Sequence, residues 1–171
     1  NYDTDLLAVA LALEQEMPDQ LEVNKQDVVN EIHQLFEAYE TALINKDVEV
    51  LDNTFWDSEH TIRYAMHENG YGFDEIHQHR VSRKKGPGIK EERRRLEILT
   101  LGDRFATVNL EFKIRGTEDV GRQTQTWVKF PTTGWKVVTA HVSTMDSTPA
   151  GKITGSPASH HSKHHRKMTE N

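Results

Sequence analysis

Two residues of this sequence combine a chemically useful group with a neighbourhood that predicts burial. Arg63 is flanked by the apolar residue Ile62 and the aromatic residue Tyr64, in a short segment that is typical of a strand. In a pocket, its planar guanidinium would anchor a carboxylate through paired hydrogen bonds. Tyr39 falls in phase with the apolar face of a helix from Val28 to Ala42, so its ring is expected in the core and its hydroxyl needs a partner. On spacing alone, a salt-bridged surface arginine and an ordinary core tyrosine remain the simpler alternatives.

Two predicted strands each have a face that mixes polar and aromatic side chains. These faces carry Gln123, Gln125 and Trp127 on residues 121–130, and Trp135, Thr139 and His141 on residues 134–144. If the sheet curves around helices, the polar groups point into a cavity and need partners, because a buried unpaired group costs about 1–3 kcal/mol. The equally simple alternative is that they lie on the solvent face of the sheet.

Three further candidates border the turn signal Asn69-Gly70 and the helix expected after it: Glu68, Tyr71 and Arg80. A hairpin centred on Asn69-Gly70 would bring Arg63 and Tyr71 opposite each other. Glu68 could pair with Arg63 or act as an acid or base.

The sequence indicates neither a metal nor a cofactor. The absence of cysteine removes thiol catalysis, disulfides and cysteine-ligated metals. The histidines between residues 60 and 79 are too scattered to dictate a metal site, and the histidines of the C-terminal tail indicate incidental metal affinity at most. No phosphate loop, G-x-S-x-G or H-E-x-x-H motif is present.

Charge divides the 171 residues into three zones. Residues 1–23 hold six acidic side chains without lysine or arginine and predict a short helical extension; residues 24–146 form the body; residues 147–171 are a basic, histidine-rich tail expected to be disordered. A net charge of −6 argues against nucleic-acid binding. The basic stretch 80–95 lacks interleaved aromatics and predicts a solvated edge or an acid-facing interface, where the extension could dock. No apolar run spans a membrane, and we expect a cytoplasmic protein.

The order of elements predicts an α+β fold. Asn24 and Asp27 resemble a capping box at the start of the first body helix, and Asp47 caps a second helix. A third helix begins near Gly72. Four strands then follow with short connections, at residues 92–101, 104–115, 121–130 and 134–144, so that sequential neighbours pair in a curved antiparallel sheet.

Several motifs resemble one family in sequence and order. They are Phe36-Glu37-Ala38-Tyr39-Glu40-Thr41-Ala42-Leu43, Thr61-Ile62-Arg63-Tyr64, Glu68-Asn69-Gly70-Tyr71-Gly72, Arg80-x-x-Arg83, Gly121-Arg122-Gln123-Thr124-Gln125-Thr126-Trp127 and Ala140-His141-Val142-Ser143. This pattern is similar to the AtzH-like family, which includes oxalurate-catabolism proteins of the HpxZ type, within the SnoaL-like, nuclear transport factor 2-like superfamily. The resemblance covers about residues 24–146.

The resemblance implies a cone-shaped barrel, usually a homodimer, with a pocket between helices and sheet. It implies that Tyr39 and Arg63 are needed for activity, because they match the tyrosine and arginine required in a member that decarboxylates 1,3-dicarboxyurea to allophanate. Ala65 and His79 depart from the family pattern, in which glycine and an aromatic residue are expected, so the substrate can differ.

We therefore expect a cofactor-free enzyme of nitrogen or purine-derived catabolism that decarboxylates or hydrolyses a small carboxylated urea or amide. In this hypothesis Arg63 and Tyr39 are catalytic, and Glu68, Tyr71, Arg80, Gln123, Gln125, Trp127 and His141 bind substrate. The alternative is a non-catalytic ligand-binding or dimerisation module that accompanies an amidohydrolase. A ketosteroid-isomerase-type base catalyst ranks last, because Glu68 is its only plausible base.

Overall fold

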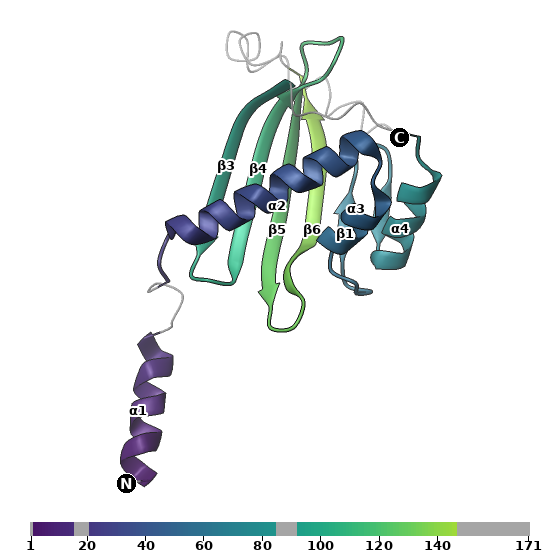
Figure 1. Cartoon of the computed structure of the whole chain (residues 1–171). Helices are drawn as coiled ribbons and strands as arrows, with labels where there is room; N and C mark the ends of the chain where they lie inside the picture. The colour runs from purple at the N-terminus through teal and green to yellow at the C-terminus, as the bar shows by residue number, and fades with distance from the viewer. Residues whose placement is uncertain (1, 16–20, 85–91, 147–171) are drawn as a thin grey trace, which may run out of the picture.

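The structure is a computed structural model that describes residues 2–15, 21–84 and 92–146 (Figure 1). It begins with α1 (Tyr2–Gln15), whose apolar side chains Leu6, Leu7, Val9 and Leu11 are 51–60% exposed. The described part of the chain therefore leaves these four apolar side chains uncovered. The tail 147–171 and residues 85–91 of the basic stretch fall outside the described residues. None of the described helices is long and apolar enough to cross a membrane.

The long helix α2 (Gln26–Asn45) provides much of the core. Val28, Ile32, Phe36 and Tyr39 are buried at intervals of three or four residues, and Glu40 and Ala42 are buried beside them. The predicted cap at Asn24 is wrong, because Lys25 takes the N-cap position without a side-chain bond. Asn24 instead joins the end of β3 (Arg93–Leu101): its Oδ1 accepts from the Thr100 N–H at 2.9 Å, and its own N–H donates to the Thr100 carbonyl at 3.0 Å.

Two short helices and a hairpin follow α2. In α3 (Val48–Thr54) the predicted cap is confirmed, since the Asp47 side chain accepts a hydrogen bond from the Val50 N–H at 3.3 Å. The hairpin pairs β1 (Ile62–Tyr64) with β2 (Asn69–Tyr71) and leads into α4 (Phe73–Ser82).

The predicted turn at Asn69-Gly70 is wrong. These residues belong to β2, and the chain reverses at residues 65–68, where the Ala65 N–H donates to the Glu68 carbonyl at 2.9 Å. Gly70 is needed for close packing instead, because a Cβ there would lie 2.7 Å from Cγ1 of Ile76 on α4. Arg63 consequently pairs with Gly70 and not with Tyr71.

The sheet confirms the predicted α+β meander. Its other strands are β4 (Phe105–Lys113), β5 (Val120–Phe130) and β6 (Gly134–Met145), and the strand order is β2-β1-β6-β5-β4-β3. Short connections make β3 to β6 antiparallel neighbours, as expected. Sequence analysis did not foresee that β1 pairs parallel to β6, with Arg63 opposite Ala140. This pairing brings the early hairpin beside the late strands.

A β-bulge in β6 reverses the alternation of that strand. Thr126 pairs with Thr139 while the next residue, Trp127, pairs with Val137, so Val138 is the extra residue. Before the bulge Val137 is buried, and after it Ala140 is buried while Thr139 and His141 are exposed. A single inserted residue therefore turns the second half of β6 over.

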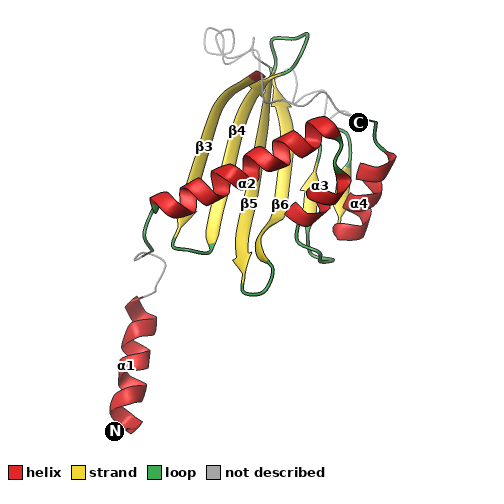
Figure 2. Ribbon diagram, viewed as in Figure 1, coloured by secondary structure: helices red, strands yellow, loops and turns green. Residues whose placement is uncertain are grey.

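The helices α2, α3 and α4 cover one face of the curved sheet, and this arrangement encloses the core (Figure 2). Phe36 and Tyr39 of α2 pack there with Phe55, Phe112 and Trp127.

Candidate functional site

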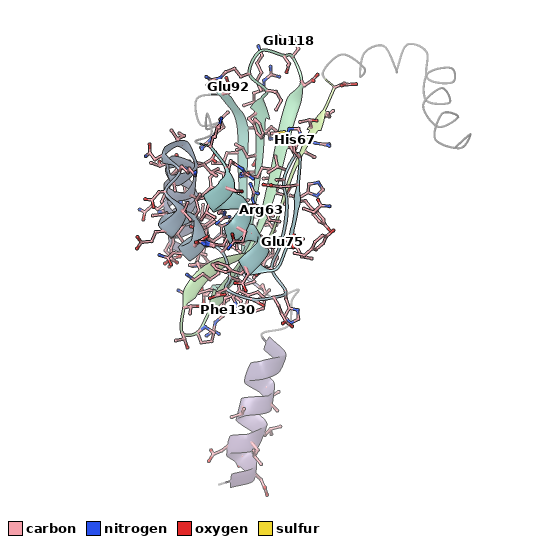
Figure 3. All side chains as sticks on the ribbon, turned by 90° about the vertical axis from the view of Figure 1, so that its right-hand side faces the viewer. Arg63, His67, Glu75, Glu92, Glu118 and Phe130 are labelled. Atoms are coloured by element: carbon pink, nitrogen blue, oxygen red, sulfur yellow. The ribbon has the colours of Figure 1, made fainter. Side chains whose placement is uncertain are left out.

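A cavity of about 430 Å³ opens between the helices and the sheet. Its wall draws on several elements, through Leu43, Leu51, Arg63, Arg80, Phe112 and Gln123. The cavity lies beside the parallel β1–β6 pair, so the unforeseen pairing helps to build it. Figure 3 shows Arg63 near the middle of the body, between the two ends of the sheet that Glu118 and Phe130 mark.

The charge on this wall is strongly one-sided. Among the described residues, five cationic side chains border the cavity, namely Lys46, Arg63, Arg80, Arg83 and Lys84, against the single carboxylate of Glu68. Because low-dielectric walls focus the field of such a cluster, the cavity favours an anion.

Arg80 is the most deeply buried of these cations, with 3% of its surface exposed. Its guanidinium carbon lies 4.3 Å above the ring of Phe55, which fixes the plane of the group. Neither Nη1 nor Nη2 has a hydrogen-bond partner among the described residues, although Nη1 lies 3.6 Å from Oδ1 of Asp52. Burial lowers the pKa of Arg80 from its ordinary value, but a guanidinium stays protonated. Arg80 thus presents a fixed positive charge with unused donors.

Arg63 and Arg83 share the carboxylate of Glu68. Arg63 is 7% exposed, and its Nη1 lies 3.7 Å from Oε1 of Glu68. Arg83 forms an ion pair with the same oxygen through Nη2, and Nδ1 of His79 lies 3.7 Å from the other oxygen. Burial, followed by the charge of Arg63, lowers the pKa of Arg83. Glu68 therefore holds together the cations at this side of the cavity.

The inner face of β5 carries the predicted polar residues. Gln123, Gln125 and Trp127 are all at most 4% exposed, which places them on the helix-facing side of the sheet. The Trp127 indole N–H donates to Oε1 of Gln125 at 3.1 Å. The amide nitrogens of both glutamines are buried without a partner among the described residues. Of the three residues only Gln123 borders the cavity.

Tyr39 lies next to this site without bordering it. The ring is 1% exposed and its centroid is 6.0 Å from that of Phe55, over which Arg80 is stacked. Its electrostatic interaction with Arg80 raises the pKa of the guanidinium and partly offsets the lowering by burial.

The structure separates Tyr71 and His141 from the cavity. Both border an outer hollow of about 490 Å³, together with Tyr64, whose ring meets His141 edge-on at 5.4 Å. The expectation that His141 and Thr139 share a face with Gln123 and Gln125 is wrong, because the bulge at Val138 turns them outward. Tyr71 is 56% exposed, because it follows Gly70, which pairs with the buried Arg63, and successive residues of a strand face opposite sides of the sheet.

Sequence reasoning missed several cavity residues. Arg83 follows Arg80 by one helical turn and could have been found from that spacing. Lys46 and Lys84 follow the ends of α2 and α4. Asp52 contacts Arg80 without bordering the cavity, and the sequence offered no signal for it, because this contact depends on the packing of α3 against α4.

The fold and its cavity define a class of protein, the cone-shaped nuclear transport factor 2-like and cystatin-like fold. A cystatin-like fold protein from Burkholderia xenovorans LB400 is 37% identical over 73% of this chain and 97% of its own, with a TM-score of 0.66. An NTF2-like superfamily protein from Salmonella enterica is 20% identical over 74% of this chain and 96% of its own, with a TM-score of 0.58, and shows the fold alone.

Within this class the chain belongs to the AtzH-like family, whose family model matches residues 21–148. A protein of unknown function from the DUF3225 family of Pectobacterium atrosepticum is 43% identical over 76% of this chain and 98% of its own, with a TM-score of 0.69. The curated proteins contain no match.

Proposed function

We propose that the cavity binds a small carboxylated urea or amide and that the protein removes a carboxyl group from it without a cofactor. The observation that carries this proposal is the cationic wall, in which the buried donors of Arg80 have no hydrogen-bond partner among the described residues. The uncommitted buried donors nearby, on Arg80 and on the amide of Gln123, call for a ligand rich in acceptor oxygens.

Each residue has a role in the proposed reaction. Arg63 and Arg80 hold carboxylate oxygens, and Gln123 donates its amide N–H to the carbonyl oxygen of the urea or amide. The bond between nitrogen and the carboxyl carbon then breaks, its electron pair stays on nitrogen, and carbon dioxide leaves. Nitrogen takes up one proton, so an N-carboxylate and a proton give an amine-type nitrogen and carbon dioxide.

Tyr39 is the proposed source of that proton. Since Tyr39 does not border the cavity, this transfer requires the reacting nitrogen to lie at the end of the cavity next to Phe55 and Arg80. Water then restores the hydroxyl proton.

The same position of Tyr39 favours a second candidate function. The cavity can bind an acid, but the Tyr39 hydroxyl is not in its wall. This arrangement suits a non-catalytic binding module that accompanies an amidohydrolase. The isolated chain would then bind the acid without turnover.

Release of carbon dioxide from freshly generated 1,3-dicarboxyurea distinguishes the two candidates. We expect turnover by the wild type and a loss of at least about tenfold for both site variants. Arg63→Ala removes a charged hydrogen bond to the carboxylate, which contributes about 1.5–3 kcal/mol, and Tyr39→Phe removes general acid catalysis, which contributes about 10²–10⁴-fold. Arg122→Ala, which removes an exposed arginine on the outer face of β5, is the matched control. Rates like wild type in both site variants contradict the catalytic assignment.

A further inference from the structure

Asp52 divides its carboxylate between two residues of α4. Its Oδ2 lies 2.6 Å from Nδ1 of His77, whereas its Oδ1 lies 3.6 Å from Nη1 of Arg80. His77 and Arg80 are three residues apart on α4, so both can face α3. The carboxylate is thus hydrogen-bonded to the histidine and only within ion-pair distance of the arginine.

This division is unusual for a buried arginine. A carboxylate and a guanidinium normally meet in a paired arrangement with N–O distances of about 2.7–2.9 Å, which uses two N–H groups at once. Here Asp52 is within reach of Arg80, yet Nη1 and Nη2 of Arg80 and Oδ1 of Asp52 are all buried without a hydrogen bond in the described structure. The strongest available pairing is therefore not formed.

The hydrogen bond from His77 to Asp52 explains why Asp52 and Arg80 do not form a paired hydrogen-bonded contact. The Asp52 side chain is 19% exposed and the His77 side chain 37% exposed. Because an ionised carboxylate can only accept, Nδ1 of His77 must donate, which assigns the proton of a neutral His77 to Nδ1. A short bond to Oδ2 then fixes the direction in which Oδ1 points.

We propose that His77 is a positioning residue that holds Asp52 back from Arg80 and so keeps the guanidinium edge of Arg80 available for the carboxylate of the ligand. Without His77, Asp52 turns onto Arg80 and takes the donors that the ligand needs. The inference rests on the proposed function only in that the ligand of Arg80 is an acid. Asp52 is a competitor of that ligand, restrained by His77.

Binding of oxalurate, with its neutral amide oxaluramide as the uncharged comparison, tests this arrangement by titration calorimetry. His77→Leu is expected to weaken oxalurate binding about tenfold, which corresponds to about 1.4 kcal/mol, and to leave oxaluramide little changed. His77→Asn keeps a donor near the position of Nδ1 and is expected to restore most of the affinity. Asp74→Asn, which changes an exposed acid on α4, is the control and is expected to match wild type.

The double variant decides between positioning and a merely structural role. If His77 acts by restraining Asp52, Asp52→Asn binds oxalurate at least as tightly as wild type, and adding His77→Leu to it costs nothing further. An equal loss from His77→Leu in both backgrounds overturns the proposal, as does wild-type affinity in His77→Leu alone.

A measurement without ligand separates this inference from the proposed function. If wild type binds no oxalurate, the proposed function is contradicted. The guanidinium signals of Arg80 in nitrogen-15 NMR, which the variant Arg80→Lys assigns, still report whether Asp52 bonds to Arg80. His77→Leu is expected to slow rotation of the Arg80 Nη groups, because Asp52 now bonds to them. Unchanged rotation in His77→Leu overturns the inference independently of any ligand.

Discussion

The indole N–H of Trp127 donates to Oε1 of Gln125 at 3.1 Å, on the inner face of β5. An indole nitrogen can only donate, so this bond determines which end of the Gln125 amide is oxygen. The amide nitrogen of Gln125 must then point away from Trp127, and it is buried without a partner in the described structure. Trp127 therefore orients this amide donor on the inner face of β5, two residues from Gln123, which borders the cavity.

This pair predicts an asymmetric response to substitution. Trp127→Phe removes the donor and leaves a buried Oε1 unpaired, so we expect it to lower the free energy of unfolding by about 1–3 kcal/mol. Adding Gln125→Met to that variant removes the unpaired group and is expected to regain part of the loss. Urea unfolding of the two single variants and the double variant measures the coupling, and simple additivity would contradict it.

Gly121 is predicted to be intolerant of any side chain. A Cβ at this position would collide with the ring of Phe112, which borders the cavity from the neighbouring strand β4. Gly121→Ala is expected to lower the free energy of unfolding by about 1–3 kcal/mol through overpacking.

The smaller Phe112→Leu side chain should relieve most of that penalty. Thr132→Ala, at an exposed position in the β5–β6 turn, is the control. Gly134→Ala would not serve, because a φ of 77° at Gly134 strains any residue with a side chain. Thermal unfolding that is the same for Gly121→Ala and the control would refute the close approach.

The ion pair between Lys25 and Asp103 predicts a weak pH dependence of stability. The two groups meet at 2.7 Å and attach the start of α2 to the β3–β4 turn. Their hydrogen bond lowers the pKa of Asp103 below its ordinary 3.8 and raises the pKa of Lys25 above 10.5. The contribution of Asp103 is thus present above pH 3.8 and is lost as the pH falls through its lower folded value.

The contribution of Lys25 is present below pH 10.5 and is lost as the pH rises past its higher folded value. Because the Asp103 side chain is 66% exposed and that of Lys25 is 32% exposed, we expect a small effect that salt screens. The stability difference between wild type and Asp103→Asn should therefore be constant near neutral pH and shrink in strong acid. Asp57→Asn, at another exposed carboxylate, is the control, and a difference that grows in acid contradicts the assignment.

The sequence indicated those parts of the cavity that depend on local pattern. Alternation along β5 predicted the common face of Gln123 and Gln125, and Arg63 was recognisable as an arginine within an apolar strand. His141 was assigned to the wrong face because one extra residue at Val138 reverses the alternation, and period-2 reasoning has no means of locating a bulge. Asp52 was missed because its role depends on the contact between two helices.

The central claim is that Arg63 and Arg80 bind a carboxylate in the cavity between the helices and the sheet. Calorimetric titration with oxalurate and oxaluramide tests this claim most directly, using wild type, Arg63→Gln, Arg80→Gln and the exposed control Arg122→Gln. We predict that wild type and Arg122→Gln bind oxalurate more tightly than oxaluramide. Arg63→Gln and Arg80→Gln should each lower the affinity for oxalurate about tenfold or more, since hydrogen bonds to charged groups contribute about 1.5–3 kcal/mol. Equal binding of the acid and the amide, or wild-type affinity in both cavity variants, would contradict the account.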